Sequence, residues 1–118
     1  MAATYNFAIE RGATFAPAPI VWKHGANALP VDLTGYTARL QVRESVTATD
    51  VLLELSTANG GIIITPLEGS IALSLSATAT AAITWVSGVY DLELTSSTGF
   101  VRRLLKGKFK VTQEVTRD

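Results

Sequence analysis

Apolar and polar residues alternate along much of this chain, which is the pattern of β-strands with one buried face and one solvated face. The clearest run spans Tyr36–Arg43. Its Ala38, Leu40 and Val42 point to one face, and the polar residues between them point to the other. The same pattern predicts further strands, namely Thr4–Ile9, Ile20–Lys23, Val51–Ser56 and Ser70–Ser76.

A β-hairpin is predicted between residues 88 and 111, where two alternating runs flank a turn-like Ser-Ser-Thr-Gly. The second run carries five basic side chains. A turn of this length is expected to pair Thr95 with Phe100. Glu93 then lies opposite Arg102, and such a cross-strand ion pair contributes a few tenths of a kcal/mol.

The segment before the Tyr36–Arg43 strand is expected to be irregular. Pro17 and Pro19 cannot donate hydrogen bonds to a strand ladder, so they predict a kink between two short strands. The His-Gly-Ala-Asn sequence that begins at His24 is turn-like, and it is expected to close a hairpin between Val21 and Val31.

One segment breaks the alternation and predicts helix. The alanine-rich sequence SATATAAITW is expected to form one or two helical turns near residues 77–84. Ser76 or Thr78 is positioned to cap the first turn, and Ile83 and Trp85 are expected to pack inward.

Turn signals recur about every ten residues between the predicted strands, which is typical of two packed antiparallel sheets. The pattern therefore predicts an all-β fold, a two-sheet β-sandwich with a single short helical segment. At 118 residues the chain is long enough for one core, so residues 1–118 are expected to form one domain. Residues 1–7 are expected to form an extended N-terminal arm.

Composition removes several classes of function. Ten basic residues balance ten acidic ones, so no overall charge favours nucleic acid or an anionic membrane as a partner. The chain has no cysteine, which excludes disulfides, zinc–thiolate sites and thiol catalysis. The N-terminus does not resemble a secretory signal, and no apolar stretch is long enough to span a membrane. A soluble protein made in a cytoplasm is the expectation.

Few residues are candidates for site chemistry. The single histidine, His24, lies in a predicted turn and is best interpreted as solvated. Asp91 and Glu93 share one strand face and could hold a cation, but no calcium-loop motif accompanies them. We therefore interpret Asp91 and Glu93 as members of cross-strand ion pairs rather than as metal ligands. We therefore predict no catalytic residue, no metal, no cofactor and no enzymatic activity.

Two surfaces are candidates for protein contacts. The lysines of the last strand alternate with apolar residues and share one face, which is either the wet or edge face of a sheet or a docking surface for an acidic protein partner. The residues of that predicted docking face are Arg102, Lys106, Lys108 and Lys110. The N-terminal arm could add a strand to a neighbouring molecule by main-chain pairing, through Thr4, Tyr5, Asn6 and Phe7.

Three segments together resemble a class of small structural proteins of tailed phages and prophages. They are VDLTGYTARLQVR (Val31–Arg43), GSIALSLSATATAAITWVSGVYDLELTSSTG (Gly69–Gly99) and RRLLKGKFKVTQEVTR (Arg102–Arg117), roughly 60 of the 118 residues in the same order. The shared features are a D-L-T-G-Y strand opening, an Ala-rich segment before an aromatic residue, and a Y-D-L-E-L-T hairpin. The class is similar to the N-terminal immunoglobulin-like domain of siphophage upper baseplate proteins.

The resemblance implies an immunoglobulin-like antiparallel β-sandwich that acts as a virion component. This component would be made in the cytoplasm of the host bacterium and would be located at the tail or baseplate. Its partners would then be other phage structural proteins, with a homo-oligomer as a further option. Two alternatives stay open. One is a capsid decoration protein, and the other is a carbohydrate-binding module, which would need exposed aromatic residues such as Trp85 or Phe100 to stack on sugar rings.

Overall fold

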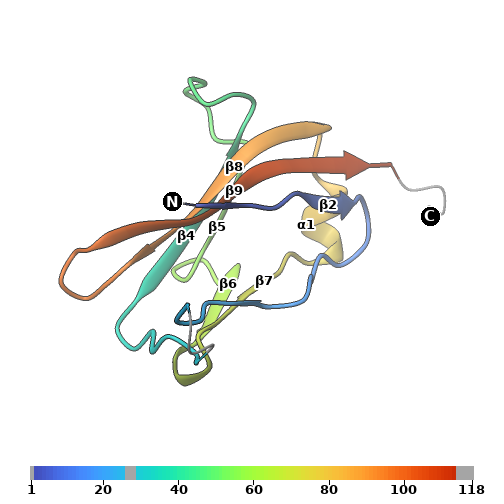
Figure 1. The fold of residues 1–118 in the computed structure, drawn as a ribbon. Coiled ribbons are helices and arrows are strands. Elements are labelled where there is room, and N and C mark those ends of the chain that lie inside the picture. The colour runs from blue at the N-terminus through green and yellow to red at the C-terminus, as the bar shows by residue number, and fades with distance from the viewer. Residues whose placement is uncertain (1, 26–28, 114–118) are drawn as a thin grey trace.

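The computed structural model describes residues 2–25 and 29–113, which form two β-sheets, one α-helix and one 3₁₀-helix (Figure 1). The larger sheet has six strands, and the smaller sheet has three in the order β3-β7-β6. The strands of the larger sheet are β1 (Ala3–Thr4), β2 (Phe7–Glu10), β4 (Thr37–Arg43), β5 (Leu53–Ser56), β8 (Ser87–Thr95) and β9 (Val101–Thr112). The remaining elements are β3 (Ile20–Val21), β6 (Ile62–Thr65), η1 (Pro66–Glu68), β7 (Ser70–Leu73) and α1 (Ala77–Ala81).

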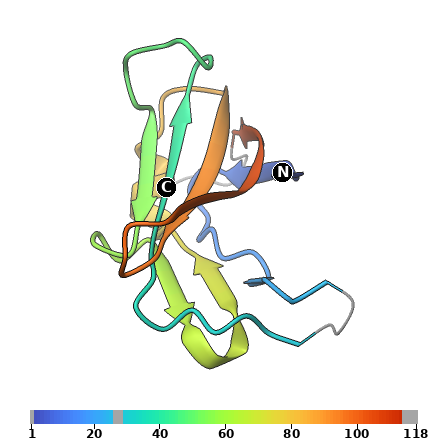
Figure 2. The ribbon, with the colours of Figure 1, turned by 60° about the vertical axis from the view of Figure 1, so that its left-hand side comes forward.

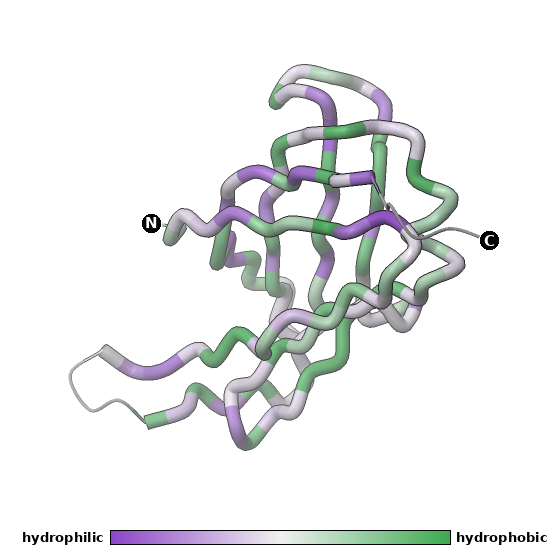
Figure 3. The backbone as a smooth tube through the Cα atoms, turned by 90° about the vertical axis from the view of Figure 1, so that its right-hand side faces the viewer, coloured by the Kyte–Doolittle hydropathy of each residue, from purple (hydrophilic) through white to green (hydrophobic). Residues whose placement is uncertain are grey.

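The core lies between the two sheets and is built from the alternate residues that the sequence pattern assigned to it. In β4, Ala38, Leu40 and Val42 are each 4% exposed or less. The smaller sheet contributes Ile71 and Leu73, also buried. Figure 3 shows hydrophobic and hydrophilic residues alternating along the strands. The predicted two-sheet arrangement and the inward faces of these strands are confirmed.

Four aromatic rings fix one end of the core. Phe109 from β9 lies 5.2 Å from Phe7, 5.8 Å from Phe15 and 5.1 Å from Tyr90, measured between ring centroids. Phe109 is fully buried. These contacts join Phe7 and Phe15, near the start of the sequence, to β8 and β9, which lie near its end.

The first two strands pair in parallel with β9, whereas the other strand pairs are antiparallel. Ala3 lies opposite Leu105, and Phe7 lies opposite Phe109. Because β1 and β2 cover one side of β9 and β8 covers the other, β9 is not an edge strand. The prediction that its lysines protect an edge strand is therefore wrong. The lysines are exposed, which confirms that they lie on the solvated face of the sheet.

The register of the β8–β9 hairpin differs by one residue from the sequence expectation. Thr95 pairs with Val101 rather than Phe100, because Ser96 donates its N–H to the Phe100 carbonyl over 2.8 Å and lengthens the loop. An irregularity then follows, in which Leu92 pairs with Leu105 and the next residue along β8 pairs two positions earlier in β9. Leu104 is the extra residue, and it forms a β-bulge.

The predicted helix and cap are confirmed, over Ala77–Ala81 rather than up to residue 84. The Ser76 hydroxyl accepts the N–H of Ala79 over 3.1 Å. Thr80 is fully buried, and its hydroxyl donates to the Ala13 carbonyl over 2.8 Å and accepts the Gly12 N–H over 3.1 Å. The helix is thereby attached to the segment that links the first strands to the rest of the core.

The irregular segment before β4 also follows the prediction in outline. No strand is assigned between residues 11 and 19, which include the two prolines, apart from a single bridge at Phe15. Of the predicted turn, residues 26–28 lie outside the described residues. On its flanks Lys23 pairs with Pro30, and Val31 donates its N–H to the Trp22 carbonyl. The hairpin register is thus one residue away from the Val21–Val31 pair that was expected.

The Asp-Leu-Thr-Gly segment before β4 is a turn held by one carboxylate. Asp32 Oδ1 accepts two hydrogen bonds from Thr34, one from its backbone N–H at 2.9 Å and one from its hydroxyl at 2.6 Å. The residue between them, Leu33, packs into the core and is 1% exposed. These hydrogen bonds to Thr34 lower the pKa of Asp32. A carboxyl group with a lowered folded pKa stabilises the fold above its unfolded pKa of about 3.9, and this contribution is lost as pH falls through the folded value.

We expect this turn to give a small, pH-dependent contribution to stability. The difference in thermal midpoint between the wild type and Asp32→Ala should be present at pH 7 and should shrink as the pH falls below about 4. Asp32→Asn is the matched control because it keeps an oxygen acceptor that does not titrate. A difference between the wild type and Asp32→Ala that stays constant from pH 7 to pH 3 would contradict this role of the carboxylate.

Candidate functional site

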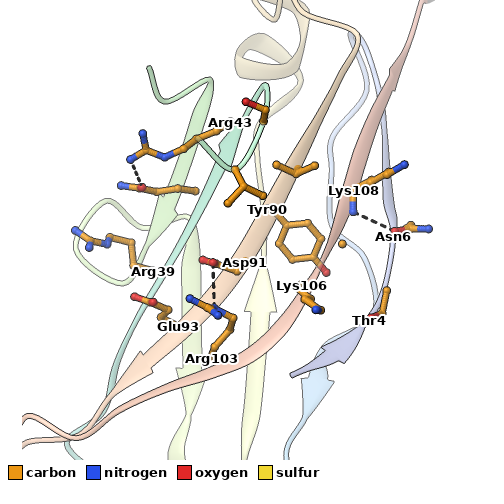
Figure 4. A pocket seen from close by; sticks show the side chains of 15 residues that line it. Thr4, Asn6, Arg39, Arg43, Tyr90, Asp91, Glu93, Arg103, Lys106 and Lys108 are labelled. Atoms are coloured by element: carbon orange, nitrogen blue, oxygen red, sulfur yellow. Dashed lines mark hydrogen bonds and ion pairs between the residues drawn. The ribbon is translucent and has the colours of Figure 1, made fainter. Parts of the chain in front are cut away.

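The outer face of the larger sheet is hollowed into a groove of about 750 Å³ (Figure 4). Five basic side chains line it: Arg39 and Arg43 from β4, and Arg103, Lys106 and Lys108 from β9. Asp91 and Glu93 from β8 lie between these two groups. We call this surface the charged groove.

Strand register explains how residues far apart in sequence come together there. Glu93 lies opposite Arg39 on one side and opposite Arg103 on the other. One row further along the sheet, Asp91 lies between Gln41 and Lys106. All of these side chains occupy the strand positions that alternate with core residues, so an acidic column on β8 is flanked by a basic column on each side.

Part of this charge is already engaged within the protein. Arg103 lies 3.1 Å from Asp91, and both side chains are about half exposed, so the pair contributes little to stability. Arg43 donates to the carbonyl oxygens of Ala48 and Thr49, each over 2.9 Å. Arg43 therefore fixes the loop that follows β4, and it is less available to a partner.

The remaining basic groups of the groove make no ion pair with any residue that the structure describes. Within the described part of the chain, the Arg103–Asp91 contact is the only ion pair. Arg39, Lys106 and Lys108 therefore make no ion pair there, and both lysines are exposed. The groove presents net positive charge to the solvent although the whole chain is neutral.

Of the four residues predicted for a docking face, the structure brings two into the groove. Lys106 and Lys108 line it, and Lys110 follows on the same side of β9, opposite Ser87. Arg102 lies apart, because the bulge at Leu104 reverses the alternation before it. Its guanidinium instead stands 5.0 Å from the ring centroid of Trp22, a cation–π contact.

Three basic residues of the groove were not among those predicted. Arg103 takes the position expected for Arg102, and the bulge that places it there has no signal in the sequence pattern. Arg39 and Arg43 did have a signal, since both alternate with the apolar residues of β4. What the sequence did not give was the order of strands, which places β4 beside β8 and so completes the groove.

The predicted arm residues pair with the chain's own β9. Tyr5 donates its N–H to the Lys106 carbonyl over 2.9 Å, and its own carbonyl accepts the Tyr90 hydroxyl over 2.6 Å. Burial of that hydroxyl raises the pKa of Tyr90 well above its ordinary value, which keeps it a donor. The Asn6 side chain accepts the Lys108 N–H over 3.0 Å. Exchange of this arm with a neighbour stays a prediction.

The described residues offer few groups for other chemistry. Within residues 2–25 and 29–113, no three His, Cys, Asp or Glu side chains gather where they could hold a metal ion. His24 is exposed, beside the hairpin turn. Trp22 and Trp85 are partly buried against the core, so neither offers a free ring face like that of Phe100, which is 63% exposed. None of the helices in these ranges has the length and apolar character needed to cross a membrane.

No protein-family model matches the sequence, and no curated protein matches it. Solved structures do match in fold. A crystal structure of chicken TCR aligns with 98% of this chain and 57% of its own, with a TM-score of 0.52 and 13% identity. The chain is an immunoglobulin-like β-sandwich. Extracellular domains 3–5 of Drosophila OTK align with 90% of this chain and 32% of theirs, with a TM-score of 0.38 and 14% identity.

The likeness concerns the fold alone, and this chain spans little more than half of the TCR chain. The immunoglobulin-like arrangement does explain where the groove lies. The order β9-β8-β4-β5 corresponds to the G-F-C-C′ order of variable-type immunoglobulin domains, and β3-β7-β6 corresponds to strands B, E and D. The charged groove is the solvent-facing surface of the first of these sheets.

Proposed function

We propose that this immunoglobulin-like domain is a non-enzymatic structural component of a tailed-phage virion, associated with the tail or baseplate. It docks through the charged groove onto an acidic surface of a neighbouring virion protein. The observation that supports docking is the groove, whose Arg39, Lys106 and Lys108 make no ion pair within residues 2–25 and 29–113. The phage context is supported by the resemblance of the D-L-T-G-Y, Y-D-L-E-L-T and closing E-V-T-R segments.

The charge pattern suits recognition of a protein surface. Cations on two strands flank carboxylates on the strand between them, so a partner is selected by the positions of its charges as well as by their sign. Exposed charges of this kind accelerate association and reject wrong partners, while adding modest affinity each. A component that must find one neighbour during assembly benefits from both effects.

The groove fits the other functions considered less well. Its single aromatic residue, Tyr90, belongs to the buried ring cluster, so the groove has no platform for stacking sugar rings or nucleic-acid bases. The two carboxylates are not both free for acid–base catalysis, because Asp91 is engaged with Arg103. A capsid decoration protein would use the same kind of docking face, and the location on the particle separates these two roles.

We expect reversal of two groove charges to reduce incorporation into the particle strongly. In the bacterium and phage that carry the gene, a deletion would be complemented with the wild type or with the double variant Lys106→Glu/Lys108→Glu. Heads and tails would then be separated and probed with an antibody to this chain. The wild type should appear in the tail fraction, and the double variant should fall by about tenfold or more, which corresponds to about 1.4 kcal/mol or more of lost binding.

Lys110→Glu is the matched control, because Lys110 lies on the same strand and side but outside the groove. It should incorporate nearly as well as the wild type. Wild-type signal on heads alone would replace the tail assignment with the decoration role, and absence from both fractions would reject a virion role. Equal incorporation of both variants would reject the groove as the docking surface.

A further inference from the structure

The larger sheet ends in two edges, and one of them is closed by a side chain. Asn59, in the turn after β5, donates its Nδ2 to the Glu54 carbonyl over 2.9 Å and accepts the Ser56 N–H on Oδ1 over 2.9 Å. Both backbone groups belong to β5 and point away from β4. Because Asn59 occupies them, these two groups are not free to pair with a further strand.

Among the residues that the structure describes, nothing covers the opposite edge. Tyr5 and Arg11 donate their N–H groups toward β9. Alternate residues of a strand direct their backbone groups to opposite sides, so those of Thr4, Asn6 and Ala8 point outward. Within residues 2–25 and 29–113, β1 and β2 pair with no strand other than β9. Figure 2 shows β2 at the margin of the molecule, with no other described strand beyond it.

Apart from the break between β1 and β2 at Tyr5 and Asn6, this edge lacks the features that usually prevent strands from pairing. No charged residue and no proline occurs from Ala2 to Ile9. Natural proteins protect free edges with lysines, prolines, bulges or covering segments, and an unprotected edge is a template for another strand. One edge is thus closed by Asn59, while the other offers a run of uncharged residues.

We propose that this edge pairs with the same edge of a second copy of this chain, in antiparallel orientation about a two-fold axis. With Asn6 near the axis, Thr4 of one copy faces Ala8 of the other, and each copy contributes the same three outward-facing residues. Small, uncharged side chains at these positions make the edge self-complementary, which a two-fold contact requires. This pairing does not depend on the proposed virion role.

The pairing would place two charged grooves on one continuous surface. A two-fold axis perpendicular to the sheet keeps the outer faces of both copies on the same side, and Thr4 and Asn6 lie at the rim of the groove. Ten basic side chains from two grooves would then be neighbours, so their repulsion opposes the dimer. Added salt screens that repulsion, and the dimer should therefore tighten as ionic strength rises.

The test is the mass of the chain in solution, by light scattering after gel filtration at about 100 μM. The wild type should be a dimer of twice 12.5 kDa. Ala8→Pro removes one outward N–H without touching the β9 ladder and should yield a monomer with an unchanged circular dichroism spectrum. Ala8→Val keeps the N–H and should remain dimeric. Where Ala8→Pro fails to fold, Ala8→Lys introduces an edge charge for the same purpose.

Cysteine cross-linking distinguishes edge pairing from arm exchange, because the chain has no cysteine of its own. A mixture of Thr4→Cys and Ala8→Cys chains should form covalent dimers on mild oxidation. Cross-links in a mixture of Thr4→Cys and Lys106→Cys chains, which are partners within one molecule, would show that the arm has swapped and would overturn the proposal. A monomeric wild type, or a dimer that survives both Ala8→Pro and Ala8→Lys, would overturn it as well.

Discussion

Replacing Phe109 with alanine is expected to lower the free energy of unfolding by about 3–5 kcal/mol, the usual cost of removing a buried aromatic ring. Phe109 is fully buried and contacts Phe7, Phe15 and Tyr90. The cavity would therefore open where the first strands meet the end of the chain. Because small domains are stable by only about 5–15 kcal/mol, this variant should be close to unfolding at 37 °C.

The matched control for this prediction is Phe100→Ala, nine residues earlier in the same hairpin. Phe100 is 63% exposed, so its removal should change the free energy of unfolding by no more than about 0.5 kcal/mol. Urea denaturation followed by tryptophan fluorescence measures both variants. Comparable losses at the two positions would mean that the ring cluster does not carry the stability assigned to it.

The alternation of apolar residues was enough to predict the fold class, because it is the direct consequence of burying one face of each strand. In β8, Tyr90, Leu92 and Leu94 are 5% exposed or less, as their spacing predicts. The helix was predictable for a different reason: the alanine-rich run departs from the alternation, and Ser76 provides the cap before it.

Strand order and register were not predictable from the same pattern. Period-two alternation determines which way a side chain points but not which strand lies beside it. The parallel pairing of Phe7 with Phe109 joins residues about a hundred positions apart, and neither sequence segment marks the other as its partner. The bulge at Leu104 was not predicted either, because alternation specifies neither the length of the hairpin loop nor the register of the strands beyond it.

Because strand order and register could not be predicted, only part of the charged groove was identified from the sequence. Lys106 and Lys108 were identified because they share one strand, and residues within a strand need only the alternation. Arg39 lies beside them only because β4 pairs with β8, and the alternation of apolar residues does not specify this pairing. For a site that spans three strands, the sequence therefore predicts which residues of each strand share a face, but it does not predict that the three strands are neighbours.

Gly107→Ala is expected to detach the N-terminal arm. A Cβ atom at this position would collide with the Tyr5 carbonyl oxygen, and it would also crowd the Asn6 side chain at 2.9 Å. Both groups are in use, one as acceptor for the Tyr90 hydroxyl and the other as acceptor for the Lys108 N–H. Relief of the collision requires movement of the arm backbone, because β9 is held on its other side by β8. The cost should be about 1–3 kcal/mol.

Amide hydrogen exchange measures this effect where it occurs. In Gly107→Ala, the N–H groups of Tyr5 and Lys108 should exchange markedly faster, because both lose their acceptors, while those of central β8 stay protected. Gly25→Ala is the control, since a Cβ there meets nothing within 4 Å. Unchanged exchange at Tyr5 would show that the arm does not need a glycine opposite it. Where the arm does detach, it takes the open edge with it, so the same variant should also be monomeric at a concentration at which the wild type forms dimers.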